Sequence, residues 1–248
     1  MDLIKVLLLF GVGTIAGLMN VMAGGGSSLT LPALIFMGLD GAMANGTNRI
    51  ALVFQNVSAV MSFRKRKFQQ YQRSLQLSLM TLPGAILGAL VAIKISDVWF
   101  QRILSIVLIG IVISMFFPTK KDQYETSAEG QKTWVIYPVM FGIGFYGGFI
   151  QVGVGFIFMA ALYHILKLDL VYVNMHKVFI ILIYMIPTLL IFLATGNVNW
   201  VFGLCLAAGN AFGGWWGAHF SVKGGEKIIR STLAAAILIM AAKLLGLS

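Results

Sequence analysis

Two glycine-rich positions interrupt the apolar stretches of this sequence. Gly24-Gly25-Gly26-Ser27 stands at the first and Gly153-Val154-Gly155 at the second, and a side-chain amide, Asn20 or Gln151, precedes each. Glycines let backbone N–H groups approach a ligand, and a helix that starts after such a break points its positive end toward it. Because amides also donate hydrogen bonds to oxyanion oxygens, this pattern favours binding of a small anion.

Further candidates are neutral or basic residues inside apolar segments. The predicted substrate-contacting residues are Asn20, Gly24, Gly25, Gly26, Ser27, Asn45, Thr47, Asn48, Arg49, Gln151, Gly153, Gly155, Asn174, His176 and Lys177. Alternatives stay open for several of them. Asn20 and Gln151 can instead form hydrogen bonds between helices, and Asn45 and Asn48 can be caps of the helix that follows. Arg49 and Lys177 can extend to the membrane interface, as long basic side chains do.

Carboxylates fall only near segment ends or in connectors. The acidic residues are Asp2, Asp40, Asp97, Asp122, Glu125, Glu129, Asp169 and Glu226. This distribution argues against a carboxylate proton relay, a cation site built on Asp or Glu, and a hydrolase with paired carboxylates. The single cysteine, Cys205, and the three histidines form no metal-ligand pattern. We therefore expect no enzyme, no metal and no cofactor.

The composition excludes a soluble globular protein. Of 248 residues, 59% are hydrophobic and 10% charged, and the mean hydropathy is +0.90, against about 45–50% apolar and about 25% charged residues in a soluble domain. The formal net charge of +10 comes from basic residues gathered in short segments between apolar runs. That distribution is the positive-inside pattern of a membrane protein, so no nucleic-acid partner is expected.

The elements that carry these residues are predicted to be membrane-spanning helices, since a helical crossing needs about 20 apolar residues. The candidates are 3–23, 44–63, 74–95, 98–117, 134–153, 171–194, 198–220 and 228–247. Two shorter apolar pieces, 27–39 and 155–167, either cross fully or return as re-entrant hairpins. Ser27 is a candidate N-cap of the first short piece. Glycines at four-residue spacing, as in Gly84 and Gly88, predict close helix packing.

The sequence repeats itself. A shift of 129 positions aligns Asn45 with Asn174, and a shift of 131 aligns Gly24 with Gly155. Each copy holds five apolar pieces, and an odd number predicts that the second copy enters the membrane from the opposite side. The basic loop 64–73 carries five Lys or Arg residues while its counterpart 194–199 carries none, as inversion requires.

We therefore predict one all-α transporter domain over 1–248, with repeat one at 1–118, a cytoplasmic linker at 118–133 and repeat two at 134–248. Each repeat has about five helical segments with a glycine-rich break. The protein is expected in the cell membrane as a multi-pass protein, with its basic loops cytoplasmic and both termini on the opposite face. The oligomeric state stays open, with a homodimer as one alternative.

The first copy resembles the sulfite exporter TauE/SafE family of membrane transporters. The resemblance rests on Ala16-Gly17-Leu18-Met19-Asn20 through Ala23-Gly24-Gly25-Gly26-Ser27, then Leu31-Pro32-Ala33-Leu34, then Ala44-Asn45-Gly46-Thr47-Asn48. The second copy resembles the degenerate partner of that motif, with Gly147-Gly148, Gly153-Val154-Gly155 and the turn Thr195-Gly196-Asn197-Val198-Asn199-Trp200. It departs from the pattern where Asn174-Met175-His176-Lys177 replaces a small-residue stretch. The resemblance implies transport of small sulfur-containing oxyanions such as sulfite, sulfoacetate or other sulfonates, usually outward. An anion channel, or a transporter of a different small organic anion, is the alternative.

Overall fold

A computed structural model of the chain describes residues 3–68, 70–115 and 133–244, and these ranges are helical, with no strand. The predicted linker 118–133 lies, except for Thr133, outside the described residues. The helices are α1 (Leu3–Met22), α2 (Ser27–Phe36), α3 (Gly41–Lys65), α4 (Tyr71–Ala92), α5 (Asp97–Met115), α6 (Ile136–Phe149), α7 (Val154–His164), α8 (Leu170–Ala194) and α9 (Trp200–Leu244). The all-helical class predicted from the apolar runs is confirmed.

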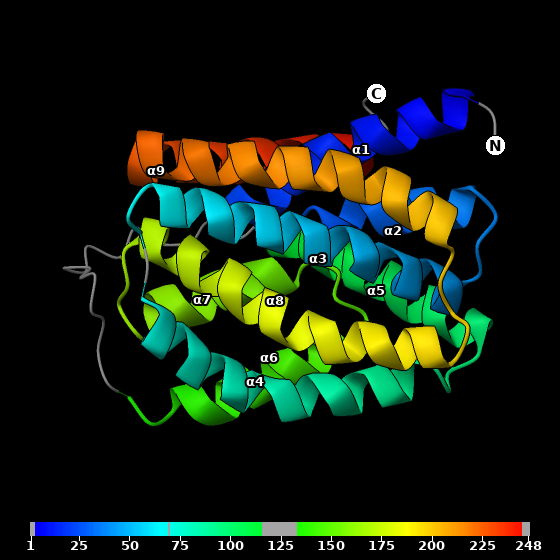
Figure 1. Cartoon of the computed structure of the whole chain (residues 1–248), viewed down its shortest axis with the longest axis horizontal. Helices are drawn as coiled ribbons and strands as arrows, with labels where there is room; N and C mark the ends of the chain where they lie inside the picture. The colour runs from blue at the N-terminus through cyan, green and yellow to red at the C-terminus, as the bar shows by residue number, and fades with distance from the viewer. Residues whose placement is uncertain (1–2, 69, 116–132, 245–248) are drawn as a thin grey trace.

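The two glycine-rich breaks are the tips of helical hairpins. In Figure 1 the connection from α2 to α3 lies at the same end of the molecule as the N-terminus, so α1 and α2 enter and leave at that end. Helices α6 and α7 form the corresponding hairpin at the opposite end, where α8 begins (Figure 1). Each short helix therefore returns toward the end from which its hairpin entered, instead of running on to the other end.

Close helix packing occurs at the predicted glycines. A Cβ atom added at Gly84 would lie 2.1 Å from the Phe141 carbonyl oxygen, and one at Gly88 would lie 2.0 Å from that of Phe145. Because the contact moves from Phe141 to Phe145 as the chain goes from Gly84 to Gly88, α4 and α6 run parallel. Gly209 and Gly213 of α9 approach the carbonyls of Phe10 and Thr14 in α1 in the same way, at 2.1 and 2.0 Å. Helices α1 and α9 are thus also a parallel pair in backbone contact.

Two apolar clusters surround the hairpins. One consists mainly of buried residues of α4, α6, α7 and α8, including Met140, Phe158 and Tyr184, with further residues from α1, α3 and α9. The other joins residues of α1, α2, α3, α5 and α9, including Leu31 and Phe100. Each hairpin therefore lies mainly in a cluster of its own, and the two meet at the breaks.

Three helices of the described part are long and apolar enough to cross a membrane by themselves, at Ile4–Met22, Tyr71–Ala92 and Leu170–Ala194. Helix α3 has the same 25-residue length as α8 but a much lower mean hydropathy, because buried Asn, Arg and Gln side chains interrupt it. Three shorter apolar helices, Ser27–Phe36, Ile136–Phe149 and Val154–His164, form the remaining hairpin arms. The sequence predicts eight segments that cross the membrane. By length and composition, only three helices of the described part meet the criterion for a crossing.

Two predicted helix boundaries are wrong. The sequence predicts separate helices at 198–220 and 228–247, whereas α9 is assigned as one helix from Trp200 to Leu244. No proline interrupts this range, and Gly224 and Gly225, at about 1 kcal/mol each, do not prohibit a helix. In Figure 1 the red part of α9 runs back behind its orange part, so the path of this one helical element still has the two segments expected from the sequence. Ser27 is the first residue of α2 and not its cap, since the N-cap is Gly26 without a side-chain hydrogen bond.

Candidate functional site

The two breaks meet in the interior. We call Gly24–Gly26 the first break and Gly153–Gly155 the second break. A Cβ atom added at Gly24 would lie 2.3 Å from the Gly155 carbonyl carbon, and one at Gly155 would lie 2.3 Å from the Gly24 Cα. Gly24 and Gly153 have φ angles of 95° and 69°, which L side chains rarely adopt. Gly24 is therefore required both by backbone conformation and by contact between the hairpins, Gly153 by conformation and Gly155 by contact.

Arg49 of α3 lies beside the second break and is completely buried. Its guanidinium donates hydrogen bonds to the Gly148 carbonyl, to Thr188 Oγ1 at 2.9 Å and to Asn45 Oδ1 at 3.3 Å. It also lies over the Phe192 ring, 4.6 Å from the centroid. Gly148 is in the last turn of α6, so the cation stabilises the negative end of that helix. The alternative that Arg49 extends to the interface is wrong.

Asn45 and Gln151 complete the second break. Asn45 Nδ2 donates to the Phe149 carbonyl at 2.8 Å, and Gln151 Nε2 donates to Asn45 Oδ1 at 3.2 Å. Gln151 has a φ of 54°, which directs the chain into the turn. The capping alternative for Asn45 and Asn48 is wrong, because Asp40 caps α3 by accepting from Met43 N at 2.8 Å.

Several buried polar atoms around the second break have no hydrogen-bond partner. They include Arg49 Nε, the Tyr184 hydroxyl and Gln151 Oε1. Both side-chain polar atoms of Asn48, elsewhere on α3, are also buried without a partner. A buried polar group without a partner costs about 1–3 kcal/mol, so such atoms are rare unless a ligand or water uses them.

Tyr184 is not among the residues predicted from the sequence. A Cβ atom added at Gly147 would lie 2.7 Å from its hydroxyl and 3.1 Å from Val154 Cγ2, which places the hydroxyl beside the start of α7. Its ring stacks on Phe158 with centroids 6.3 Å apart. The 129-position shift pairs Tyr184 with Gln55. That pairing is the signal by which the sequence could have identified it.

Lys177 of α8 lies beside the first break and, as Arg49 does at the second, donates a hydrogen bond to a carbonyl at the end of the preceding helix. Its Nζ donates to the Val21 carbonyl at 2.8 Å and to Asn174 Oδ1 at 2.7 Å, and the side chain is completely buried. Asn174 Nδ2 approaches the Met22 carbonyl at 3.4 Å. Lys177 therefore stabilises the carboxyl end of α1, and the alternative that it extends to the interface is also wrong.

Neutral amides fill the rest of the first break. Gln55 Oε1 accepts from Asn20 Nδ2 at 3.2 Å and from Asn210 Nδ2 at 3.4 Å. The alternative of interhelical hydrogen bonds is thus what the structure shows for Asn20, and also for Gln151, whose amide bonds to α3. Neither Gln55 nor Asn210 is among the predicted site residues.

The remaining predicted residues have other contacts. Thr47 Oγ1 accepts from Asn199 N at 2.9 Å and so links α3 to the start of α9. His176 contacts Ser74 Oγ at 2.8 Å and Gln70 Oε1 at 3.1 Å, toward α4. Gly25 accepts a hydrogen bond from Ser28 Oγ at 2.6 Å within the first break. Among the described residues, no three His, Cys, Asp or Glu side chains are grouped to hold a metal ion.

Comparison with known proteins gives consistent results. A family profile described as "Sulfite exporter TauE/SafE" matches residues 9–244. The chain is 28% identical to "Probable membrane transporter protein ORF9" of Sinorhizobium sp, over 96% of this chain and 91% of that protein. It is 28% identical to "Probable membrane transporter protein YfcA" of Escherichia coli K12, covering 96% and 88%. It is 23% identical to "Probable membrane transporter protein YunE" of Bacillus subtilis, over 94% of this chain and 95% of that protein. No solved structure matches the chain.

Proposed function

The chain belongs to the TauE/SafE family of membrane transporters, and from this premise we propose that it transports small sulfur-containing oxyanions, such as sulfite or a sulfonate, across the cell membrane. The proposed direction is export and the proposed mechanism is alternating access. The substrate class follows the description of the matching family. The contacts at the second break support an anion on independent grounds.

The observation that carries the proposal is the set of unpartnered donors at the second break. Arg49 Nε and the Tyr184 hydroxyl are buried without a hydrogen-bond partner, beside the first turn of α7. An oxyanion that enters between them would accept both hydrogen bonds and compensate the buried positive charge. A cationic substrate would instead be repelled by the buried Arg49 guanidinium. We therefore propose that the second break is the main binding site.

The packing of matched helices supports two inverted copies. By the 129- and 131-position shifts, α6 corresponds to α1 and α9 to α4. The first helix of each copy packs in parallel against the fourth helix of the other copy, α1 against α9 and α6 against α4. The hairpins enter from opposite ends and touch at their tips (Figure 1). We propose that transport moves one hairpin relative to the other about this contact.

The orientation follows from charge. The end of α3, with Arg64 and Lys65 in its last turn, is proposed to face the cytoplasm. Helices α4 and α6 begin at that same end (Figure 1). A sulfur oxyanion leaving the cytoplasm would then approach from the basic end of the molecule.

The experiment is a binding and transport assay on the full chain. Purified protein is titrated with sulfite, sulfoacetate, sulfate and acetate in a thermal-shift assay, and proteoliposomes are tested for counterflow of the anion that binds. Tyr184→Phe removes only the hydroxyl. Tyr172→Phe, on the same helix with its ring 5.4 Å from that of Phe68, is the matched control.

We expect a sulfur oxyanion to stabilise the wild type and the Tyr172→Phe variant, with saturable counterflow, and to bind Tyr184→Phe about tenfold more weakly. Failure of every sulfur anion to bind the wild type would overturn the substrate class. Equal binding to wild type and Tyr184→Phe would remove the second break as the site. Flux that neither saturates nor shows counterflow would favour the channel alternative.

A further inference from the structure

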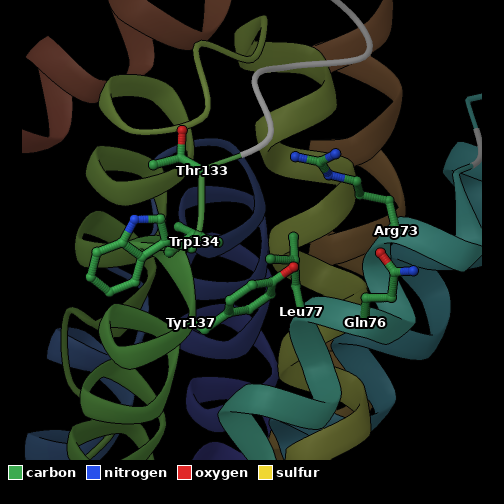
Figure 2. Close-up of a pocket in the computed structure, with 7 residues that line it drawn as sticks. Arg73, Gln76, Leu77, Thr133, Trp134 and Tyr137 are labelled. Atoms are coloured by element: carbon green, nitrogen blue, oxygen red, sulfur yellow. The ribbon is translucent and has the colours of Figure 1, made fainter.

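A cavity of about 340 Å³ lies between the beginnings of α4 and α6, well apart from the breaks. Figure 2 shows Arg73, Gln76 and Leu77 on α4, with Thr133 and Trp134 on the segment that leads into α6 and Tyr137 in the first turn of α6. None of these residues belongs to the first or the second break.

The polar groups of the cavity suit a phosphate. The Arg73 guanidinium carries a fixed positive charge and can form paired hydrogen bonds with phosphate oxygens. The Gln76 amide, on the α4 side, and the Thr133 hydroxyl, on the α6 side, add neutral donors to the cavity lining. Because α4 and α6 run parallel and both begin here, the positive ends of two helices add to the charge of Arg73.

The rim of the cavity has the composition of a membrane interface. Trp134 is 75% exposed and Tyr137 is 46% exposed, and both ring types are enriched where headgroups meet acyl chains. Farther along α4 and α6, away from the basic end, Leu79 and Phe141 are also exposed. The cavity thus opens onto an apolar face that would lie in the bilayer.

We propose that this cavity binds the phosphate of an anionic phospholipid headgroup, with the acyl chains along the exposed apolar face of α4 and α6. The apolar continuation favours a lipid over a free anion, because free phosphate or sulfite would gain nothing from Leu79 and Phe141. The bound lipid would link α4 of the first copy to α6 of the second. It would therefore stabilise one of the parallel helix pairs that join the copies.

The test measures lipid preference at Trp134. Full-length protein is placed in nanodiscs of phosphatidylcholine containing increasing fractions of brominated phosphatidylglycerol or brominated phosphatidylcholine, and tryptophan quenching is recorded. Trp134→Phe identifies the part of the quenching that arises at the cavity. Arg73→Gln and Arg73→Lys test the anion contact, and Arg102→Gln on α5 is the control, because Arg102 is an exposed arginine stacked on Trp99 outside the cavity.

We expect the Trp134-dependent quenching to need about fivefold less brominated phosphatidylglycerol than brominated phosphatidylcholine. Arg73→Gln should remove this preference, while Arg73→Lys keeps part of it and Arg102→Gln keeps it whole. Equal quenching by the two lipids in the wild type, or an unchanged preference in Arg73→Gln, would overturn the proposal. If Arg73→Gln fails to fold, Gln76→Leu provides the second test, with a reduced preference expected.

A second experiment with soluble anions distinguishes a lipid phosphate from a free anion as the occupant of the cavity. Inorganic phosphate and sulfite are added to the protein in detergent without phosphatidylglycerol, and Trp134 fluorescence is followed. A saturable change that Arg73→Gln abolishes, together with no lipid preference, would assign the cavity to a soluble anion and overturn the lipid proposal. No change with either free anion, together with the lipid preference, would support it.

Discussion

The first and second breaks have the same backbone design but different polar chemistry. At each break a buried cation from the other copy stabilises the carboxyl end of a helix, Lys177 at α1 and Arg49 at α6. The matched positions 55 and 184 then differ. Gln55 accepts two amide hydrogen bonds, whereas the Tyr184 hydroxyl has no partner. At the first break only an acceptor, Asn210 Oδ1, is left without a partner, whereas the second break leaves the donors Arg49 Nε and Tyr184 hydroxyl without one. The difference teaches that the second break has the donors left for an anionic ligand.

The largest expected effect comes from the cations. Arg49→Met should weaken anion binding about a hundredfold, because the variant removes both the charge and the unpartnered Nε donor. Lys177→Met should weaken it less than tenfold, since the Lys177 ammonium is already bonded to Val21 and Asn174. Calorimetric titration of the two variants checks this order. Equal losses would mean that both breaks bind the anion.

A second test breaks the contact between the hairpins. Gly155→Ala should lower the free energy of unfolding by about 1–3 kcal/mol, because the new methyl group would meet the Gly24 backbone and no flexible side chain can move aside. Gly142→Ala on the same hairpin is the control, since nothing lies within 4 Å of its added Cβ. Helix propensity predicts an effect within about 1 kcal/mol there. Chemical denaturation in mild detergent measures both, and equal effects would contradict the contact.

A third test exchanges the roles of the matched residues. Gln55→Leu should lower the free energy of unfolding by about 1–3 kcal/mol, because Asn20 and Asn210 lose their shared acceptor inside the protein. Tyr184→Phe should change it by less than about 0.5 kcal/mol or raise it, since no hydrogen bond is lost. Denaturation curves for the two variants, measured beside the anion titrations, check the assignment. A large destabilisation by Tyr184→Phe would make that hydroxyl structural.

The smallest effect is expected at the paired amides. Asn20→Ala should cost about 0.5–1.5 kcal/mol of stability, because Gln55 keeps its second donor, Asn210. Gln151→Ala should cost a similar amount and should also reduce anion binding, since Gln151 positions Asn45 beside Arg49. Thermal shifts with and without sulfite distinguish the two variants. A greater loss of anion binding in Asn20→Ala than in Gln151→Ala would indicate that the anion binds at the first break and not at the second.

The sequence predicted the fold class and the breaks, because both follow from local composition. Apolar runs long enough for a membrane, glycines at matched positions and the absence of carboxylates from the spans are each visible in the chain alone. The predicted packing role of Gly84 and Gly88 is confirmed by their contact with α6. The boundary predicted near 221–227 failed because Gly and charged residues weaken a helix without ending it.

The polar partners were decided only by the tertiary structure. Arg49 and Asn45 bond to carbonyls about a hundred positions away in the chain, and Lys177 to one still farther, so no local pattern separates them from interfacial side chains. Which donors keep free hydrogen-bonding capacity is likewise a matter of packing. In the sequence, Tyr184 is one aromatic residue in the apolar helix α8. Only the folded structure places its hydroxyl beside α6 and the start of α7. The sequence by itself determined the two matched glycine-rich breaks and the absence of carboxylates from the spans, since both are properties of composition and repeat spacing. Only the fold decided which donors at those breaks remain without a partner, since that depends on contacts between residues far apart in the chain.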